Sequence, residues 1–486
     1  MSRDDDADDK RLPLKIVAAG PEHVIMLRGA NAAGVSAYQT VTPKLTSYSL
    51  DRLNHVGEEE LTGEDVFVET VEYFGGKVVV IGTADREDGT AIAWREVDPK
   101  LARKDLPYKD LGVFPGKEKG RWRSAYSSSW QSKYSTKVSA DGRYMLIVSP
   151  EFRDKESNLA LFKLVLVDTD MNPVWGRMLV PDNRSDMTEI QDVAVDDDGS
   201  AYLIIQERFS SPEVKNKEIN FDLALYRVKG EEVQRGVMNF DGGVHPRTAV
   251  IRQAPKGGMV IAGTYASTQG KDWYALGNFL TKVAPGGVSF EGVKTYEFPP
   301  EKEDKKYKGY SWMTIVDLHP RTDGGAFIVN DRAWSEGHAS DGNVDWHHGD
   351  AMIVSIDQNG EENWITHIPR HTEAGNRVTG TMMPAVFSDK LYVFTIDDEN
   401  QKEKRKDHDG GSIGKFAGGR MFSAYFVFDE NGKYREKTIL TSDKGNRAIQ
   451  GTRLEPVGDG VYMALGSTGH NKKKSYPVKV SFSLEE

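Results

Sequence analysis

The sequence predicts an all-β fold built from repeated four-stranded antiparallel units, and three observations support this. Short apolar strands alternate with Asp- and Gly-centred turns along nearly the whole chain. No segment between these strands repeats apolar residues at the helical period over three turns, so almost no helix is expected. The chain has 486 residues, 38% of them hydrophobic and 28% charged, which suits a globular protein with a large core.

Composition and charge exclude several classes of function. The chain carries 63 Lys and Arg against 74 Asp and Glu, a net charge of −11, which argues against nucleic-acid binding. It has no Cys, which excludes thiol catalysis, disulfides, iron–sulfur clusters and Cys-rich zinc sites. No apolar run approaches the roughly 20 residues that span a bilayer. We therefore expect no nucleic-acid partner and no membrane span.

The first residues are acidic and differ from the rest. Residues 1–11 are expected to be a disordered acidic lead without the apolar core of a signal peptide, and 12–486 a single domain. The chain is cytoplasmic if it begins here. It is extracytoplasmic, periplasmic or on a bacterial cell surface, if a signal peptide was removed. The absence of Cys favours the second interpretation, because stray thiols are oxidised there.

Each predicted unit contains two tight turns. We call its strands A to D, with one tight turn between A and B and the other between C and D. Asp, Asn and Gly favour such turns because they tolerate left-handed backbone or accept bonds from nearby amides. The A–B turns are centred on Gly75-Gly76, Asp141-Gly142, Asp198-Gly199, Gly257-Gly258, Asp323-Gly324, Asp389 and Asp459-Gly460. The C–D turns contain Asp51, Asp98, Asp168, Gly230, Gly286-Gly287, Asp357 and Asp429.

Units of about 50 to 70 residues with this pattern resemble the blades of a β-propeller. The likeness is to secreted and cell-envelope bacterial propellers with Asp-Gly hairpins, and it extends over roughly residues 13–486. The sequence lacks the WD40 signature, the double glycine of kelch blades and a regular Asp box. Counting C strands predicts eight blades of four antiparallel strands, with seven as the runner-up.

Ring closure has two alternatives. The last unit lacks a fourth strand, and Leu12–Val17 could supply it, joining the two ends of the chain and removing a sheet edge. If Leu12–Ala19 instead begins the first blade, the ring closes without that exchange and a seven-bladed count becomes possible.

The remaining connections are long and polar, and this geometry places them on the opposite face of the ring. Loops of that length on a rigid scaffold often carry function. They are Arg208–Asn220, Asp331–Asp350, Asp397–Arg420 and Gly466–Ser475 between B and C strands, with Gly116–Tyr134 and Pro299–Trp312 between blades.

Candidate binding residues lie in these loops. Imidazoles and carboxylates could hold a divalent metal such as calcium, and Trp could stack on a sugar. Neighbouring His side chains point oppositely on extended backbone, so a polar loop packed on the ring is favoured over a metal site. No cofactor is indicated. The candidates are Arg121, Trp122, Tyr126, Tyr310, Trp334, His338, Asp345, Trp346, His347, His348, Asp350 and His408.

Two other groups are interpreted as structural. The acidic run Asp196–Asp198 falls in a predicted tight turn, where turn chemistry explains it better than a calcium cage. Trp175 and Trp364 open D strands in equivalent places, so we expect both to pack between blades.

Three functions remain open. The first is a non-catalytic binding or scaffold propeller that holds a protein partner or a cell-surface polymer through its long loops. The second is a polysaccharide hydrolase or lyase with acids and histidines at the central mouth. The third is a quinoprotein dehydrogenase, which eight blades fit but whose Trp-docking repeats and vicinal disulfide are missing. The absence of catalytic motifs favours binding over enzyme function, since fold alone does not decide function.

Overall fold

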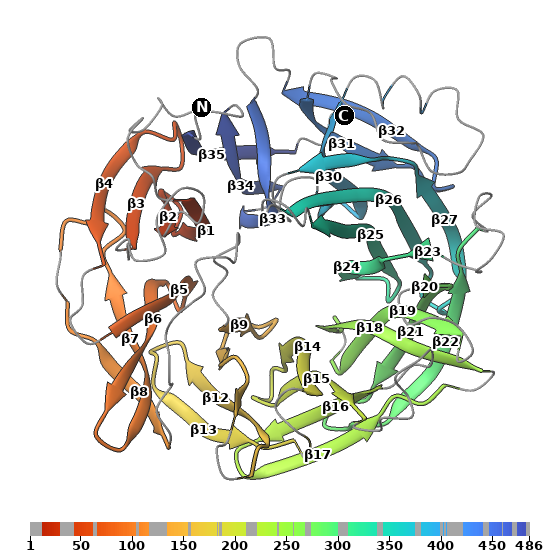
Figure 1. Ribbon diagram of the computed structural model, residues 1–486. Helices are drawn as coiled ribbons and strands as arrows, with labels where there is room; N and C mark the ends of the chain where they lie inside the picture. The colour runs from red at the N-terminus through yellow and green to blue at the C-terminus, as the bar shows by residue number, and fades with distance from the viewer. Residues whose placement is uncertain are drawn as a thin grey trace.

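Eight antiparallel sheets surround a central axis in the computed structural model of the chain (Figure 1). The structure describes residues 12–29, 43–61, 66–103, 106–115, 134–153, 157–181, 183, 187–209, 221–240, 243–255, 257–267, 274–299, 310–337, 344–374, 381–398, 402, 405, 421–440, 447–458, 460–468 and 474–482. Among these, only Lys402 and Arg405 have α-helical backbone. The described residues include no helix long and apolar enough to cross a bilayer. The all-β prediction is confirmed.

The first four blades follow the chain in order. Blade 1 has β1 (Leu12–Ala19), β2 (His23–Gly29), β3 (Lys44–Ser49) and β4 (His55–Glu60); blade 2 has β5 (Val66–Phe74), β6 (Lys77–Arg86), β7 (Gly89–Val97) and β8 (Lys109–Phe114). Blade 3 has β9 (Ser135–Val138), β10 (Tyr144–Val148), β12 (Ala160–Asp168) and β13 (Pro173–Leu179), with β11 (Phe152–Arg153) beside β12. Blade 4 has β14 (Thr188–Val195), β15 (Ala201–Arg208), β16 (Phe221–Lys229) and β17 (Glu232–Val237).

The other four blades complete the ring. Blade 5 has β18 (Val244–Gln253), β19 (Met259–Ser267), β21 (Gly277–Val283) and β22 (Phe290–Glu297), and β20 (Tyr274–Ala275) pairs with β23 (Tyr310–Ser311). Blade 6 has β24 (Met313–Pro320), β25 (Ala326–Gly337), β26 (Val344–Ile356) and β27 (Glu362–Ile368), with β28 (Thr372–Ala374) beside β26. Blade 7 has β29 (Met383–Phe387), β30 (Lys390–Asp398), β31 (Met421–Phe428) and β32 (Tyr434–Leu440), and blade 8 has β33 (Arg447–Gly458), β34 (Val461–Thr468) and β35 (Lys474–Ser481).

Burial explains which strands are apolar. The B strands lie between neighbouring blades, and β6 is buried along most of its length, as its run of Val and Ile predicts. The D strands form the rim, and β17 is mostly exposed or half-buried. The hydrophobic clusters join consecutive blades: one combines Leu146 and Leu164 of blade 3 with Leu203 and Ile205 of blade 4. The core is therefore the series of contacts between blades.

Eight blades are confirmed. Of the two alternatives for ring closure, the strand exchange is wrong, and the one in which Leu12–Ala19 begins the first blade is confirmed, although the count is eight and not seven. The segment Leu12–Val17 belongs to β1, which pairs with β2 as the innermost strand of blade 1. Blade 8 consequently has three strands among the described residues. Apolar packing connects the two blades instead, with Ile16 and Met26 of blade 1 against Met463 and Leu465 of blade 8.

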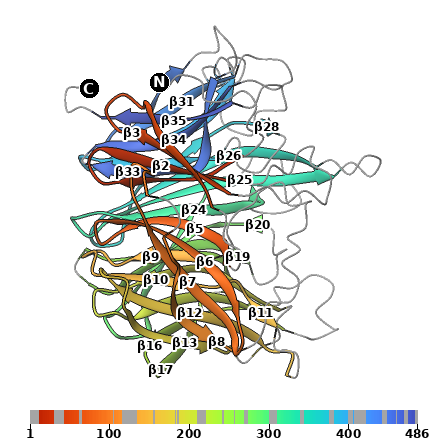
Figure 2. The same ribbon diagram turned by 90° about the vertical axis from the view of Figure 1, so that its left-hand side faces the viewer.

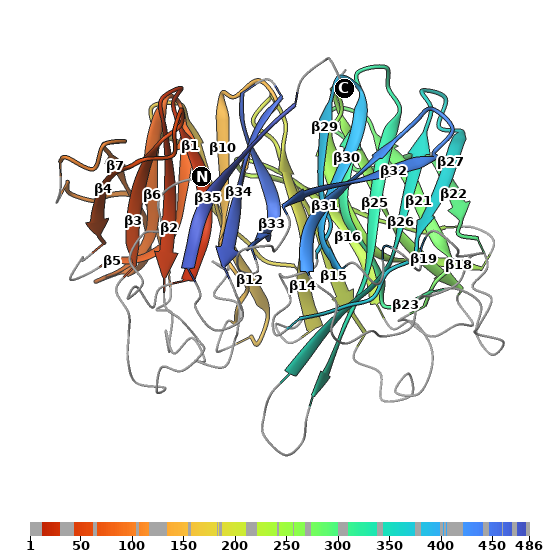
Figure 3. The ribbon, with the colours of Figure 1, turned by 90° about the horizontal axis from the view of Figure 1, so that it is seen from above.

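The tight turns gather on one face, which we call the tight-turn face, and the opposite face is the long-loop face (Figure 3). Blade 2 differs, because its B and C strands are joined by Glu87-Asp88 alone and its C–D connection is longer. Two predicted loops are also shorter than expected. Half of Gly466–Ser475 belongs to β34 and β35, and most of Asp331–Asp350 belongs to β25 and β26.

Asp side chains close the C–D turns as predicted. Asp357 Oδ1 accepts the amides of Asn359 at 2.8 Å and Glu361 at 2.7 Å, and these bonds hold the pKa of Asp357 below its ordinary value. Gly360 follows with φ 77°, a backbone conformation that glycine adopts without strain. Asp429 and Gly432 repeat the arrangement one blade later.

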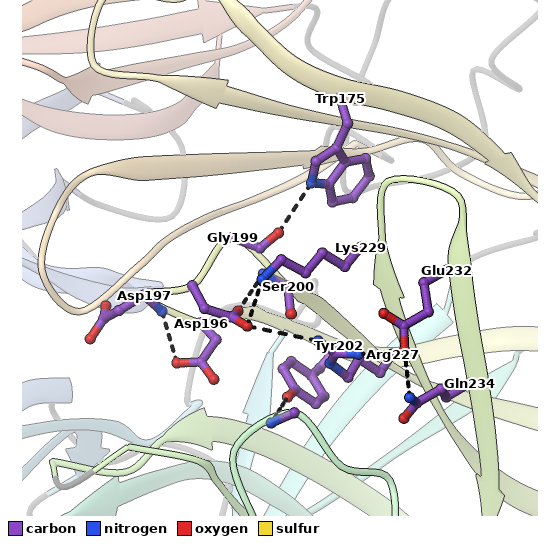
Figure 4. A network of polar contacts seen from close by, with 12 residues as sticks. Trp175, Asp196, Asp197, Gly199, Ser200, Tyr202, Arg227, Lys229, Glu232 and Gln234 are labelled. Carbon is purple, nitrogen blue, oxygen red and sulfur yellow. Dashed lines mark hydrogen bonds and ion pairs between the residues drawn. The ribbon is translucent and has the colours of Figure 1, made fainter.

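The acidic run at the A–B turn of blade 4 is confirmed as turn chemistry (Figure 4). Asp198 accepts the Ser200 amide at 2.8 Å and forms an ion pair with Lys229 at 3.0 Å. Trp175 Nε1, from blade 3, donates to the Gly199 carbonyl at 3.1 Å. The predicted structural role of Trp175 is confirmed, and Trp364 likewise stacks on Phe428 of blade 7.

Candidate functional site

Blade 6 contains the longest strand of the described residues, β26 with 13 residues, and its partner β25 has 12. They pair as far as Gly337 and Val344 and project from the long-loop face (Figures 2 and 3). We call residues 332–337 and 344–349 the blade 6 arm. This segment was predicted as an irregular loop because it is long and polar. Its strands are held by cross-strand side-chain pairs, and β28 extends the sheet beside β26.

Three rings pack on one side of the arm. Trp334 and His347 are cross-strand partners, and their rings stack with centroids 5.1 Å apart. His371 meets the edge of Trp334 at 5.5 Å, and its Nε2 lies 3.4 Å from His347 Nδ1. The Arg332 guanidinium lies over the Trp334 ring at 5.5 Å. The contacts of Trp334 are therefore largely internal, although the residue is only half-buried.

A buried ion pair holds the root of the arm. Arg370, which follows β27, is 1% exposed and donates through Nη2 to Asp331 Oδ1 at 2.5 Å. His348 Nδ1 lies 3.3 Å from Asp331 Oδ2. Burial opposes ionisation of Asp331, yet Arg370 and then His348 outweigh it and hold the pKa of Asp331 below its ordinary value. Asp331 is therefore a permanent anion at neutral pH.

The same arginine ties blade 6 to blade 7. Its backbone amide donates to Asp350 Oδ1 at 3.2 Å, and its Nη1 donates to Thr395 Oγ1 on β30 at 2.8 Å. The other Asp350 oxygen lies 3.4 Å from His367 Nε2. Asp331, Asp350 and Thr395 are all at most 2% exposed. Such a network fixes the angle between the arm and the ring.

Blade 7 has its own buried anchor next to this one. Arg405 pairs with Asp397 and, at 3.0 Å, with Glu436 Oε2, and it donates to the Pro369 carbonyl at 3.4 Å. Burial would lower the pKa of Arg405, but the two carboxylates raise it above its ordinary value. The segment that follows β27 is thus held at Arg370 to Asp331 of blade 6 and at Pro369 to Arg405 of blade 7.

The predicted site residues fall into separate places. Trp334, Trp346, His347, His348 and Asp350 come together in the arm and its root. Asp345 lies in β26 opposite Glu336. Tyr310 lies at the edge of this group: it is 2% exposed, donates to the Pro299 carbonyl at 2.8 Å and packs on Phe298 and on His367, which lies beside Asp350. The other candidates, Arg121, Trp122, Tyr126, His338 and His408, lie outside the described residues.

The two neighbouring histidines do not converge on one point. His347 packs against Trp334 and His371, whereas His348 faces Asp331 on the other side of the strand. Across the described part of the chain, no three His, Cys, Asp or Glu side chains form a group that could hold a metal ion. The local sequence carried no signal for Arg370, which lies 39 residues from its partner Asp331.

A second polar feature, also missed from the sequence, lines the axis. One charged side chain from the A strand of each of blades 1 to 6 contributes to a belt in which the signs alternate. The members are Lys15, Glu72, Lys137, Asp192, Arg252 and Asp317. Lys15 pairs with Glu72, which also accepts a hydrogen bond from Thr136 of blade 3.

Neighbouring members of the belt form close ion pairs. Lys137 Nζ lies 3.3 Å from Asp192, and Arg252 reaches both Asp192 and Asp317 at 2.5 Å. Asp192 and Asp317 directly follow β-bulges in their strands, a device that redirects side chains.

The belt bears on the enzyme hypothesis. A glycoside hydrolase needs one carboxyl group whose pKa is raised so that it can donate a proton. At Asp317 burial opposes ionisation, but Arg252 and then His319 lower the pKa to about 2. Lys137 and Arg252 likewise outweigh burial and lower the pKa of Asp192. These two acids converge on one guanidinium and serve as its counter-ions.

Comparison with known proteins adds only fold-level likeness. No protein-family model and no curated protein matches the chain. Among solved structures, the β-propeller domain of the Trilobed protease from Pyrococcus furiosus is 11% identical, with a TM-score of 0.38, over 87% of this chain and 97% of that one. An uncharacterized protein of Listeria monocytogenes is also 11% identical, with a TM-score of 0.38, over 88% and 97%. A puromycin-hydrolyzing peptidase of Mycobacterium tuberculosis is 12% identical, with a TM-score of 0.37, over 87% and 53%.

The assignment of the fold rests on the strand pairing itself. Eight antiparallel sheets follow one another around an axis, each with its first strand innermost. The chain is a β-propeller of eight blades.

Proposed function

We propose that the protein is a non-catalytic binding propeller that holds a protein partner on its long-loop face through the blade 6 arm. The observation that carries the proposal is the buried root of the arm, where Asp331, His348 and Arg370 fix the hairpin to blades 6 and 7. A projecting hairpin on a rigid base loses little conformational entropy when a partner binds, which favours affinity.

A protein partner is favoured over a polymer by the surroundings of Trp334. Stacking on a sugar ring needs an open indole face, but His347 stacks on Trp334 and the Arg332 guanidinium also lies over the ring. Trp346 is half-buried and lies opposite Ser335 in the arm. Half-buried aromatic side chains on a rigid hairpin are typical anchors of protein interfaces.

The test shortens the arm and leaves its root intact. Replacing residues 335–346 by Asn-Gly joins the cross-strand partners Trp334 and His347 through a two-residue turn. The matched control is Tyr73→Ala, which removes an aromatic side chain, 38% exposed, near the tight-turn face. Both variants and the unaltered protein are immobilised, exposed to extract of the source cell and compared by quantitative mass spectrometry.

We expect one stoichiometric protein that is retained by the unaltered protein and by Tyr73→Ala, and reduced at least about tenfold by the short-arm variant. Thermal unfolding checks that the short-arm variant keeps the ring, as expected because Asp331 and Arg370 remain. Equal retention by the short-arm variant would overturn the role of the arm. Release of sugars from envelope polysaccharide, with no retained protein, would favour the enzyme hypothesis.

A further inference from the structure

Blade 8 has a groove along its outer side, where the other seven blades carry a fourth strand. β35 is the outermost strand of blade 8 among the described residues, and it pairs with β34 alone. The groove beside it has a volume of about 680 Å³. Its walls are Tyr425 and Ile439 of blade 7, Val478–Phe482 of blade 8 and Asp51–Leu53 of blade 1.

The pairing of β35 shows which backbone groups face this groove. The Phe482 amide donates to the Gly460 carbonyl at 2.8 Å, so Phe482 points its backbone groups toward β34. Backbone direction alternates along an antiparallel strand, and the N–H and C=O groups of Lys479 and Ser481 therefore point outward. Pro477 has the same parity, which suits a residue without an N–H on an edge strand. An extended peptide can hydrogen-bond to this edge.

Contacts in other blades identify the groove as the place of a fourth strand. Side chains of three D strands donate to a carbonyl in the C–D turn of the next blade: Arg177 to Gly230 at 3.1 Å, Tyr296 to Gly360 at 2.7 Å and Thr366 to Gly432 at 2.6 Å. The blade that follows blade 8 in the ring is blade 1, and its C–D turn, 50–54, lines the groove.

In the described structure, that turn is reached from the C strand instead. Lys479 Nζ donates to the Leu50 carbonyl at 3.4 Å. An added strand would restore the contact that the D strands make elsewhere.

The two sides of the groove differ in chemistry. Val478, Val480 and Phe482 pack with the apolar cluster of blade 7, and Ile439 on β32 is 38% exposed there. On the blade 1 side, Lys479 is exposed and the side chain of Arg52 is 81% exposed. A strand added to β35 would place alternate side chains on these two sides.

We infer that this groove binds an extended segment of a partner protein, in which apolar residues alternate with acidic ones, as the fourth strand of blade 8. This site is separate from the blade 6 arm. A second copy of the chain is disfavoured because its own β35 carries Lys474 and Lys479 and no acidic residue, so it lacks the charge that this side of the groove favours. Residues 1–11 are disfavoured because they contain five Asp but, apart from Met1, no large apolar residue to fill the groove.

The test supplies a strand of that chemistry to the full chain. The probe is an eight-residue segment of alternating Val and Glu, attached after Glu486 through a flexible Gly-Ser linker, which raises its effective concentration to about millimolar. The control carries alternating Val and Lys. The readout is hydrogen exchange of the Lys479 and Ser481 amides. We expect the Val–Glu strand to slow their exchange at least about tenfold relative to the Val–Lys strand.

Two variants separate the backbone bond from the charge. Lys479→Pro removes an outward donor that β34 does not use, so it should abolish the slowing at Ser481. Lys479→Gln keeps the donor and should reduce the slowing only in part. Unchanged exchange with both strands, or equal slowing by both, would overturn the proposal. Two further outcomes would also overturn the proposal. Slow exchange in the unextended protein that disappears on dilution would assign the groove to a second copy of the chain. Slow exchange that disappears on deletion of residues 1–11 would assign the groove to that segment.

Discussion

Replacing Arg252 by Met tests the axial belt, because this guanidinium lies between Asp192 and Asp317. At neutral pH the substitution leaves two carboxylates facing each other without their shared cation. The pKa of Asp317 falls from 3.8 to about 2 in the folded chain, and each unit corresponds to about 1.4 kcal/mol. The expected loss is therefore about 2 kcal/mol. It is below the roughly 3–5 kcal/mol of a fully buried pair because the side chains are 13–27% exposed.

The effect has a defined pH dependence. A carboxyl group whose pKa is lowered on folding contributes its full stability above its unfolded pKa, here 3.8, and loses it as the pH falls toward 2. Thermal unfolding at about pH 7 should show Arg252→Met melting about 3 °C lower, since a chain this long shifts by about 1–2 °C per kcal/mol. At about pH 3, which lies between the folded and unfolded pKa values of Asp317, about half of the difference should remain, and it should become small only near pH 2.

The control for this measurement is Arg52→Met. Arg52 pairs with Asp51 at 3.7 Å, but the two side chains are 81% and 72% exposed, so its melting temperature should be unchanged. Equal shifts in the two variants, or a shift for Arg252→Met that persists at low pH, would refute the electrostatic account of the belt.

Three further substitutions test other parts of the structure. Arg370→Met leaves Asp331 buried without its main partner, so the free energy of unfolding measured in urea should fall by about 3–5 kcal/mol. Hydrogen exchange in the arm should also accelerate, and unchanged exchange would argue against Arg370 as the anchor of the arm. Gly263→Ala places a Cβ 1.8 Å from the Thr248 carbonyl oxygen, so a loss of about 1–3 kcal/mol is expected in the same assay, and no loss would mean that the strands separate easily there. Gly432→Ala forces a side chain onto backbone with φ 77° and should cost at least about 1–2 kcal/mol; a neutral result would show that the turn can rearrange.

The fold was predictable because its turns are local. Asp357 and Asp429 bond to amides two and four residues later, so the sequence of each turn contains both partners. The buried B strands are equally local, since unbroken runs of Val and Ile indicate strands covered on both sides. The blade count followed from counting the C strands that precede the C–D turns.

Ring closure was not predictable in this way. Whether Leu12–Val17 joins the last blade or begins the first depends on packing between segments more than 400 residues apart. The segment pairs with β2, its immediate neighbour in sequence, and local hairpins cost less loop-closure entropy than distant pairs. The arm was mistaken for a loop because its strands are polar, and polar residues are typical of loops.

The interacting residues that were found only in the structure are far apart in the sequence. Arg370 and Asp331 are 39 residues apart in the sequence. The belt members Asp192, Arg252 and Asp317 lie in three consecutive blades, 4, 5 and 6. A periodic search for charges of alternating sign in successive A strands could have detected the belt. The contact between Arg370 and Asp331 had no such signal, because Arg370 lies after β27, outside the repeated strands, and reaches back to β25 of the same blade.

Photo-crosslinking at the arm tests the proposed binding face most directly. A benzoylphenylalanine placed at position 346 in the source cell should crosslink one specific protein, whereas the same residue at position 73, near the tight-turn face, should not. Crosslinking of no protein at position 346, or of the same set of proteins at both positions, would contradict the claim that the blade 6 arm holds a partner.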